Sequence, residues 1–133
     1  MPNPRVSVEL DLPMPPRELS PNYRGHWGKV GFIRKGYRQH CQVLAQNMMQ
    51  AGGEYPLAPP VVAEVTFTFP DRRWRDQDNA LASLKACWDG LVDAGLLADD
   101  KMPDFRVVPQ QEEYRKGVSG VRVRLVAGEE YGQ

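Results

Sequence analysis

The sequence has few cysteines, no long hydrophobic run and no net charge. Cys41 and Cys87 are its only cysteines, and neither stands in a CxxC or Cys/His spacing. This argues against a disulfide framework or a structural zinc site and favours the reducing cytoplasm. No apolar stretch approaches the roughly 20 residues of a membrane span, so no membrane partner is expected. The first residues also lack the positive-then-apolar order of a signal peptide, which again predicts a cytoplasmic protein.

Charge is balanced overall but unevenly distributed. The 17 Lys/Arg and 17 Asp/Glu residues cancel, which argues against a protein that coats nucleic acid through bulk charge. Acidic residues are absent from Leu19 to Gly53, a segment that contains five Lys/Arg residues and two histidines. Glutamate is absent from Asp71 to Asp104, where eight aspartates occur instead. A basic segment beside an aspartate-rich one predicts an anionic ligand and a place for cations.

Hydrophobic periodicity predicts four strands and two helices. Apolar and polar residues alternate over 6–12, 61–69 and 120–127, and 105–114 is predicted as an edge or bulged strand because it contains Pro109. Apolar residues recur every three or four positions over 32–51 and 79–95, which predicts helices that end at Gly52–Gly53 and at Gly95. The order predicts a single α+β domain over 1–133, with a small mixed sheet of about four strands, both helices on one face, and a tail at 128–133.

Two basic segments are candidate ligand-binding surfaces. The first, 17–31, is predicted as a loop and carries Asn22, Arg24 and Trp27, side chains suited to phosphates and bases. The alternative is an ordered surface loop whose Trp27 covers the core. The second is the N-terminal half of the first helix, with Arg34, Lys35 and Arg38. A solvated helix face is the alternative there, but the absence of interleaved acidic residues favours binding.

The aspartates have the spacing of a metal site. Asp76 and Asp78 point the same way in an extended segment, and paired carboxylates suit Mg²⁺, although an aspartate before a helix is also an ordinary cap. On a continuous helix from Asp78, Lys85 and Asp89 return to within about 20° of its direction, where a lysine would neutralise a phosphate. Asp99 and Asp100 follow that helix, and Arg72, Arg73 and Arg75 precede it. Metal-held water, charge neutralisation and a cationic track together are the parts of phosphodiester hydrolysis.

These motifs resemble a known family. The string PDRRWRDQDN, the helix with Lys85 and the run WDGLVDAGLLADD, together with LPMPPRELSPN before them and FRVVPQ after them, resemble the RusA family of Holliday-junction resolvases, small phage and prophage nucleases. The resemblance implies an α+β homodimer that cleaves four-way DNA junctions with Mg²⁺, or Mn²⁺ in its place. It implies that Asp76, Asp78 and Asp100, with Asp99 as neighbour, are the catalytic metal ligands and that Lys85 is the catalytic lysine.

The position of the lysine departs from the family pattern. A family lysine follows the second aspartate by four residues, whereas Ala82 stands there and Lys85 stands seven residues after Asp78. A three-residue insertion between Asn79 and Lys85 accounts for the difference. On one continuous helix it would leave the lysine on the same face, about 4.5 Å further along the axis.

The expected function is therefore a Mg²⁺-dependent endonuclease that resolves branched DNA in recombination and repair. The expected DNA-binding residues are Asn22, Arg24, Lys29, Arg34, Lys35, Arg38, Arg72, Arg73 and Arg75. Three alternatives stay open: a branched-DNA-binding protein of prophage origin that does not cleave, a nuclease for flaps or single strands, and an α+β interaction protein whose aspartates are caps and surface charge.

Overall fold

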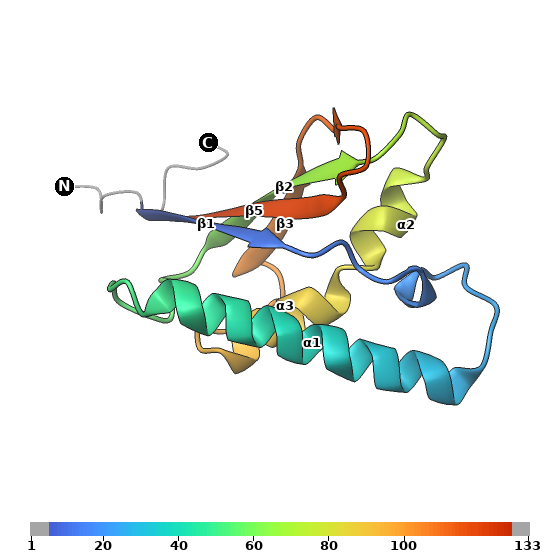
Figure 1. Cartoon of the computed structure of the whole chain (residues 1–133). Coiled ribbons are helices and arrows are strands. Elements are labelled where there is room, and N and C mark those ends of the chain that lie inside the picture. The colour runs from blue at the N-terminus through green and yellow to red at the C-terminus, as the bar shows by residue number, and fades with distance from the viewer. Residues whose placement is uncertain (1–5, 129–133) are drawn as a thin grey trace.

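Helices α1 and α3 cover one face of an open five-stranded sheet in the computed structural model, which describes residues 6–128 (Figure 1). In chain order the elements are β1 (Val6–Leu12), the 3₁₀ helix η1 (Arg17–Leu19), α1 (Trp27–Met49), β2 (Val61–Phe69), α2 (Gln77–Ala82), α3 (Lys85–Asp93), β3 (Phe105–Pro109), β4 (Glu113–Tyr114) and β5 (Gly120–Ala127). The predicted α+β class, the mixed sheet and the packing of helices on one face are confirmed. Within residues 6–128, every helix is too short or too polar to cross a membrane.

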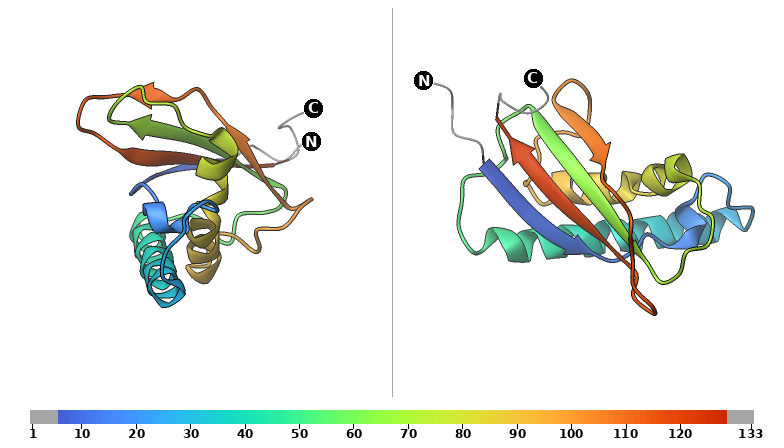
Figure 2. Two further views of the ribbon diagram at one scale, coloured as in Figure 1. Left: turned by 90° about the vertical axis from the view of Figure 1, so that its right-hand side faces the viewer. Right: turned by 90° about the horizontal axis from the view of Figure 1, so that it is seen from above.

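The sheet order explains why both helices lie on the same face. The strands are arranged β1-β5-β2-β3, with β5 antiparallel to both neighbours and β3 parallel to β2. The connections β1–α1–β2 and β2–α2–α3–β3 both join parallel strands, and such connections share one handedness, which carries their helices to one side (Figure 2). The two-residue strand β4 adds the fifth strand by pairing with the end of β2. β3 lies at the sheet edge, as predicted, but the run 105–114, predicted as one strand, divides after Pro109 into β3 and β4.

The core forms between the helices and the inner face of the sheet. Alternate residues of β2, from Val61 to Phe69, are buried, as the period of two predicted. Tyr37 of α1 is buried among them and donates a hydrogen bond from its hydroxyl to the Pro13 carbonyl (2.7 Å). Trp88 of α3 packs edge-on against Phe105 of β3, with ring centroids 5.2 Å apart.

The backbones of α1 and α3 touch at a glycine. A Cβ atom on Gly90 would lie 2.4 Å from the Arg38 carbonyl oxygen and 3.1 Å from the Cys41 Cβ, so this position has no room for a side chain. Five residues later Gly95, with φ of 83°, ends α3. The Gly95 amide donates to the Val92 carbonyl and the Leu96 amide to the Leu91 carbonyl, which is the Schellman pattern and confirms the predicted stop at Gly95.

Two predicted helix boundaries are wrong. The first helix begins at Trp27, five residues before Phe32, and Trp27 is 87% exposed, so the alternative that Trp27 covers the core is wrong too. This end of α1 projects beyond α3 and buries little, so no apolar periodicity marked it (Figure 1). The second helix is not continuous over 79–95: α2 ends at Ala82 and α3 begins at Lys85.

Leu84 explains the break, and also why the sequence hid it. Its φ and ψ of −86° and 0° leave the α-helical region, and its amide donates to the Leu81 carbonyl in a tight turn. The Leu84 side chain is nevertheless fully buried, so it continues the apolar stripe of a helix whose backbone has turned. The predicted tail at 128–133 lies outside the described residues, apart from Gly128.

Candidate functional site

Asp76 and Asp78 lie at the start of α2. Asp76 is its N-cap, and the Asp76 Oδ1 atom accepts a hydrogen bond from the Asn79 amide (3.1 Å). Asp78 lies in the first turn, where a negative charge is favourable beside the unpaired amides of the helix. The capping role considered for Asp76 is therefore confirmed, and it uses one of the two carboxylate oxygens.

Lys85 lies between two aspartates at the start of α3, and we call Lys85, Asp89 and Asp100 the Lys85 cluster. The Lys85 Nζ atom donates hydrogen bonds to Asp89 Oδ1 (3.0 Å) and to Asp100 Oδ2. The Asp100 side chain is only 11% exposed. The hydrogen bond from Lys85 lowers the pKa of Asp100, and the same bond raises the pKa of Lys85. The cluster therefore holds a carboxylate and an ammonium group in their charged forms at neutral pH.

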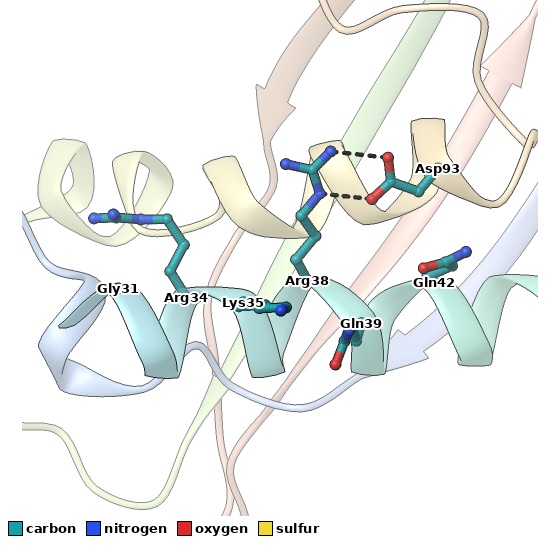
Figure 3. A pocket seen from close by; sticks show the side chains of 7 residues that line it. All are labelled: Gly31, Arg34, Lys35, Arg38, Gln39, Gln42 and Asp93. Carbon is teal, nitrogen blue, oxygen red and sulfur yellow. Dashed lines mark hydrogen bonds and ion pairs between the residues drawn. The ribbon is translucent and has the colours of Figure 1, made fainter. Parts of the chain in front are cut away.

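Arg38 joins this cluster to α1. Its Nε and Nη2 atoms donate to the two carboxylate oxygens of Asp93 at 2.6 and 2.8 Å (Figure 3). Its Nη1 atom lies 4.0 Å from Asp89 Oδ2. The hydrogen bond from Arg38 lowers the pKa of Asp93. An open groove of about 400 Å³ runs along this helix pair and is lined by Arg34, Lys35, Arg38 and Asp93. Arg38 thus acts as a link between helices as well as lining a basic groove.

Residues 71–75, which we call the basic loop, are held by Arg75. The Arg75 guanidinium donates to the Asp71 and Arg73 carbonyls and to the Asp71 carboxylate, all within 3.0 Å, and it stacks on Phe69 at 4.1 Å. Arg72 stacks on Tyr114 at 4.5 Å. Hydrogen bonds from the Arg73 amide and from Arg75 lower the pKa of Asp71. The loop is thus built by its own side chains, with Arg73 left exposed.

The remaining predicted DNA-binding residues gather at the N-terminal end of α1. Asn22 and Arg24 precede the helix, and Lys29, Arg34 and Lys35 lie on it, all exposed. No acidic residue stands in the first turn of α1 to offset its positive end. The arrangement favours an anionic partner along this part of the helix.

The structure does not bring the four predicted metal ligands together. Asp76 and Asp78 belong to α2, whereas Asp99 and Asp100 follow α3, and within residues 6–128 no three Asp, Glu, His or Cys side chains form a ligand group. The donor set still fits the chemistry of Mg²⁺ and Mn²⁺, since all four donors are carboxylates. Mg²⁺ usually takes only one or two protein carboxylates, with water and substrate phosphate as its other ligands.

The predicted site omits Asp89 and Asp93, the aspartates that pair with Lys85 and Arg38. Asp89 was noted on the helix face of Lys85 but not included, although its spacing of four residues from Lys85 was the usable signal. Asp93 carried no such signal, because its partner Arg38 lies 55 positions earlier in the chain. Only the contact of α1 with α3 reveals that pair.

Comparison with known proteins identifies relatives, although no family model matches the chain. The protein named crossover junction endodeoxyribonuclease RusA from Escherichia coli K12 is 36% identical over 105 residues, which cover 77% of this chain and 82% of that protein. Its namesake from Enterobacteria phage 82 is 35% identical over 106 residues, with the same coverage. An uncharacterised protein from Xylella fastidiosa is 36% identical over 92 residues, 69% of this chain and 60% of that protein.

The solved structures add no functional argument. Thiamine monophosphate kinase from Aquifex aeolicus aligns with 96% of this chain and 33% of the kinase, but with a TM-score of 0.33 and 9% identity. The sequence relatives are decisive, because their identity extends over most of both chains and they carry the same name in a bacterium and in a phage. The chain therefore belongs to the RusA family of crossover junction endodeoxyribonucleases.

Proposed function

We propose that this protein is a Mg²⁺-dependent, structure-selective endonuclease that resolves Holliday junctions and related branched DNA in recombination and repair. The observation that carries the proposal is the Lys85 cluster in a chain of this family: a lysine ammonium held against a nearly buried aspartate, immediately after the Asp76/Asp78 pair. Mn²⁺ is the alternative ion. The enzyme class is a crossover junction endodeoxyribonuclease, that is, a phosphodiester hydrolase.

In this proposal the aspartates hold one or two metal ions from two places, Asp76 and Asp78 at the start of α2 and Asp99 and Asp100 after α3. The metal, when bound, would supply an activated water and charge stabilisation at the scissile phosphate. Asp100 lies beside Lys85, whose hydrogen bond lowers the pKa of this carboxyl. Lys85 stabilises the negative charge that develops on the phosphoryl and leaving oxygens. Asp89 holds the Lys85 ammonium at that place through its 3.0 Å hydrogen bond.

The basic residues bind the DNA backbone on either side. Lys29, Arg34 and Lys35 lie on α1 and Arg24 lies just before it. Arg34 and Lys35 line the open groove of about 400 Å³, where they would bind phosphates of a strand. Asn22, Arg72, Arg73 and Arg75 complete the proposed set, together with Arg38, which lines the groove but is already paired with Asp93. The Arg72 guanidinium lies over the Tyr114 ring, which holds its charge in place for a strand.

A homodimer is part of the proposal. A four-way junction has two-fold symmetry, so a symmetric pair of chains would place one site at each of two opposite strands. We also propose that residues 1–133 form one catalytic domain, and that it acts in the cytoplasm, where buried free thiols such as Cys41 and Cys87 stay reduced.

A cleavage assay tests the function. A labelled synthetic four-way junction, a matched duplex and a flap are incubated with the wild type and with Asp78→Asn, with and without Mg²⁺. Paired nicks in opposite strands of the junction, made only by the wild type and only with Mg²⁺, are the expected result. Cleavage of the flap alone would instead identify a nuclease of other specificity, and the absence of binding and cutting would overturn the proposal.

A second candidate is a branched-DNA-binding protein that no longer cleaves. The break between α2 and α3 favours it, because Asp78 and Lys85 lie on two different helices and the alignment expected from one continuous helix does not apply. This candidate predicts that the wild type and Asp78→Asn bind the junction equally and that neither yields nicks with Mg²⁺ or Mn²⁺.

A further inference from the structure

Trp74, in the basic loop, is a large hydrophobic side chain that is exposed to solvent. It is 99% exposed, so its indole contacts almost nothing else in residues 6–128. A tryptophan side chain offers up to about 250 Å² of surface, and burial of that surface usually stabilises a folded protein or a complex. The loop forms the corner between β2 and α2, at the upper right of Figure 1. Nothing in the assigned site uses this side chain.

The loop that carries Trp74 is held in shape by its neighbours. Asp71 Oδ1 accepts from the Arg73 amide (3.0 Å) and from Arg75 Nη2 (2.8 Å), and Arg75 is anchored on Phe69. On either side of Trp74, the Arg73 backbone and the Arg75 guanidinium therefore have hydrogen-bond partners, while the indole itself is exposed to solvent. A binding group on a preorganised loop loses less conformational entropy when it binds than one on a mobile loop.

We propose that Trp74 stacks on an unpaired nucleobase at the branch point of the DNA. Every base has an aromatic face that an indole can stack on, and in intact duplex those faces are already covered. Arg72, Arg73 and Arg75 are neighbours of Trp74 in the chain, and Asp71, which pairs with Arg73 and Arg75, is the only acidic residue of the loop, so the loop keeps a positive charge that favours a polyanion over an apolar protein surface. Trp74 is thus the residue that distinguishes branched DNA from duplex, whereas the cations bind both.

Its position along the chain fits this role. Trp74 precedes Asp76 by two residues, so their backbones lie within about 7 Å. That distance corresponds to about two steps along a nucleic acid strand. A base held by Trp74 would therefore place the phosphates one or two nucleotides away beside the aspartates at the start of α2. This inference rests on the proposed function and specifies how the substrate is recognised.

Binding measured without cleavage tests the inference. Fluorescence anisotropy in Ca²⁺ buffer gives the affinity of the full chain for a four-way junction, a duplex of equal length and a single strand. Trp74→Ala should bind the junction about tenfold more weakly and the duplex unchanged, since stacking is lost and the charge is kept. Trp74→Phe, which retains an aromatic face, should stay within about threefold of the wild type. Val43→Ala, a half-exposed position on α1, controls for truncation of a surface side chain.

A base analogue reports the contact directly. The fluorescence of 2-aminopurine at the branch point should change on binding to the wild type and not to Trp74→Ala. Equal junction affinity of wild type and Trp74→Ala would overturn the inference, as would a change in oligomeric state of Trp74→Ala, which would assign Trp74 to a contact between copies. If the wild type shows no affinity for junctions, the proposed function is wrong whatever the role of Trp74. Equal affinities of the two proteins for the single strand would then overturn the inference as well.

Discussion

Lys85 has two roles at the scale of the single residue, and substitution separates them. In the structure it is an ion partner of Asp89 and Asp100, and in the proposed reaction it stabilises developing negative charge. Lys85→Met should reduce the junction cleavage rate by about 100-fold or more, a typical effect of removing such a group. Its junction affinity in Ca²⁺ buffer should change less than twofold, because DNA binding depends on many other cations.

The matched control for this prediction is Lys101→Met, which removes an exposed lysine next to Asp100 and leaves the Lys85 cluster intact. It should cleave like the wild type. Normal single-turnover cleavage by Lys85→Met would show that Lys85 only neutralises its two aspartates, and the role in the reaction would be withdrawn.

Gly90 shows how a single position sets the distance between two helices. Gly90→Ala places a Cβ 2.4 Å from the Arg38 carbonyl, so α1 and α3 must move apart. Overpacking of this kind costs about 1–3 kcal/mol, and we expect the free energy of unfolding in urea to fall by about 2 kcal/mol. Gly36→Ala is the control, because nothing lies within 4 Å of its added Cβ; a better helix residue there should raise stability by about 0.5–1 kcal/mol. A fall of equal size in both variants would contradict the explanation.

At the scale of the element, α2 depends on a residue that also belongs to the proposed metal site. Asp76→Asn keeps an oxygen that can accept from the Asn79 amide, so stability should stay within about 0.5 kcal/mol of the wild type. Cleavage should be lost, because the negative charge is gone. Asp76→Ala should lose cleavage and also about 1 kcal/mol of stability. Urea unfolding and the junction assay measure the two effects, and full activity of Asp76→Asn would leave Asp76 a cap alone.

The strands β1, β2 and β5 could be predicted from the sequence, whereas the division of 105–114 into β3 and β4, one helix start and one helix break could not. Val61 to Phe69 alternates because one face of β2 is buried, and burial is what the periodicity records. The start of α1 at Trp27 is exposed, so it leaves no such record. Leu84 is buried whether or not the backbone continues as a helix, so a pattern of apolar residues cannot report the turn there.

The candidate site likewise contains contacts that the sequence could predict and contacts that it could not. The spacing of Lys85 and Asp89 on one helix is a local property and can be seen in the sequence. The bond from Lys85 to Asp100 and the pair of Arg38 with Asp93 require elements to meet in space. The family resemblance named Lys85 and Asp100 as residues of one site, but neither the resemblance nor any spacing predicted the bond between them or the pair of Arg38 with Asp93.

At the scale of the whole molecule, the ion pairs made by α3 connect stability to pH. Arg38 lowers the pKa of Asp93, and Lys85 lowers that of Asp100, from an unfolded value near 3.9. As pH falls toward and below that value, the unfolded chain binds more protons than the folded one. The contribution of these ion pairs to the free energy of unfolding is therefore fully present above about pH 5 and is lost as pH falls through the lowered pKa values. Urea unfolding at pH 6 and pH 3 should show this loss.

Asp93→Asn tests the source of the acid sensitivity. The variant should be less stable than the wild type at pH 6, where Arg38 loses its partner, and should lose less stability between pH 6 and pH 3. Asp104→Asn is the control, since the exposed Asp104 side chain forms no ion pair within residues 6–128. It should follow the wild type at both pH values, and an identical pH dependence of Asp93→Asn and wild type would contradict the explanation.

The chain has no net charge, but some of its cations are already paired with a carboxylate and others are not. The salt dependence of DNA affinity distinguishes these two kinds of cation. Arg34 lines the groove of α1 without an ion pair within residues 6–128, so a DNA phosphate that binds it releases counterions. Arg38 is already neutralised by Asp93. Arg34→Gln should therefore reduce the slope of log affinity against log salt for junction DNA by about 1, whereas Arg38→Gln should change that slope little and instead lower the free energy of unfolding. Affinities at four salt concentrations and urea unfolding measure both. A full unit of slope lost in Arg38→Gln would mean that Asp93 releases Arg38 when DNA binds, and the α1–α3 ion pair would then be a contact of the free protein alone.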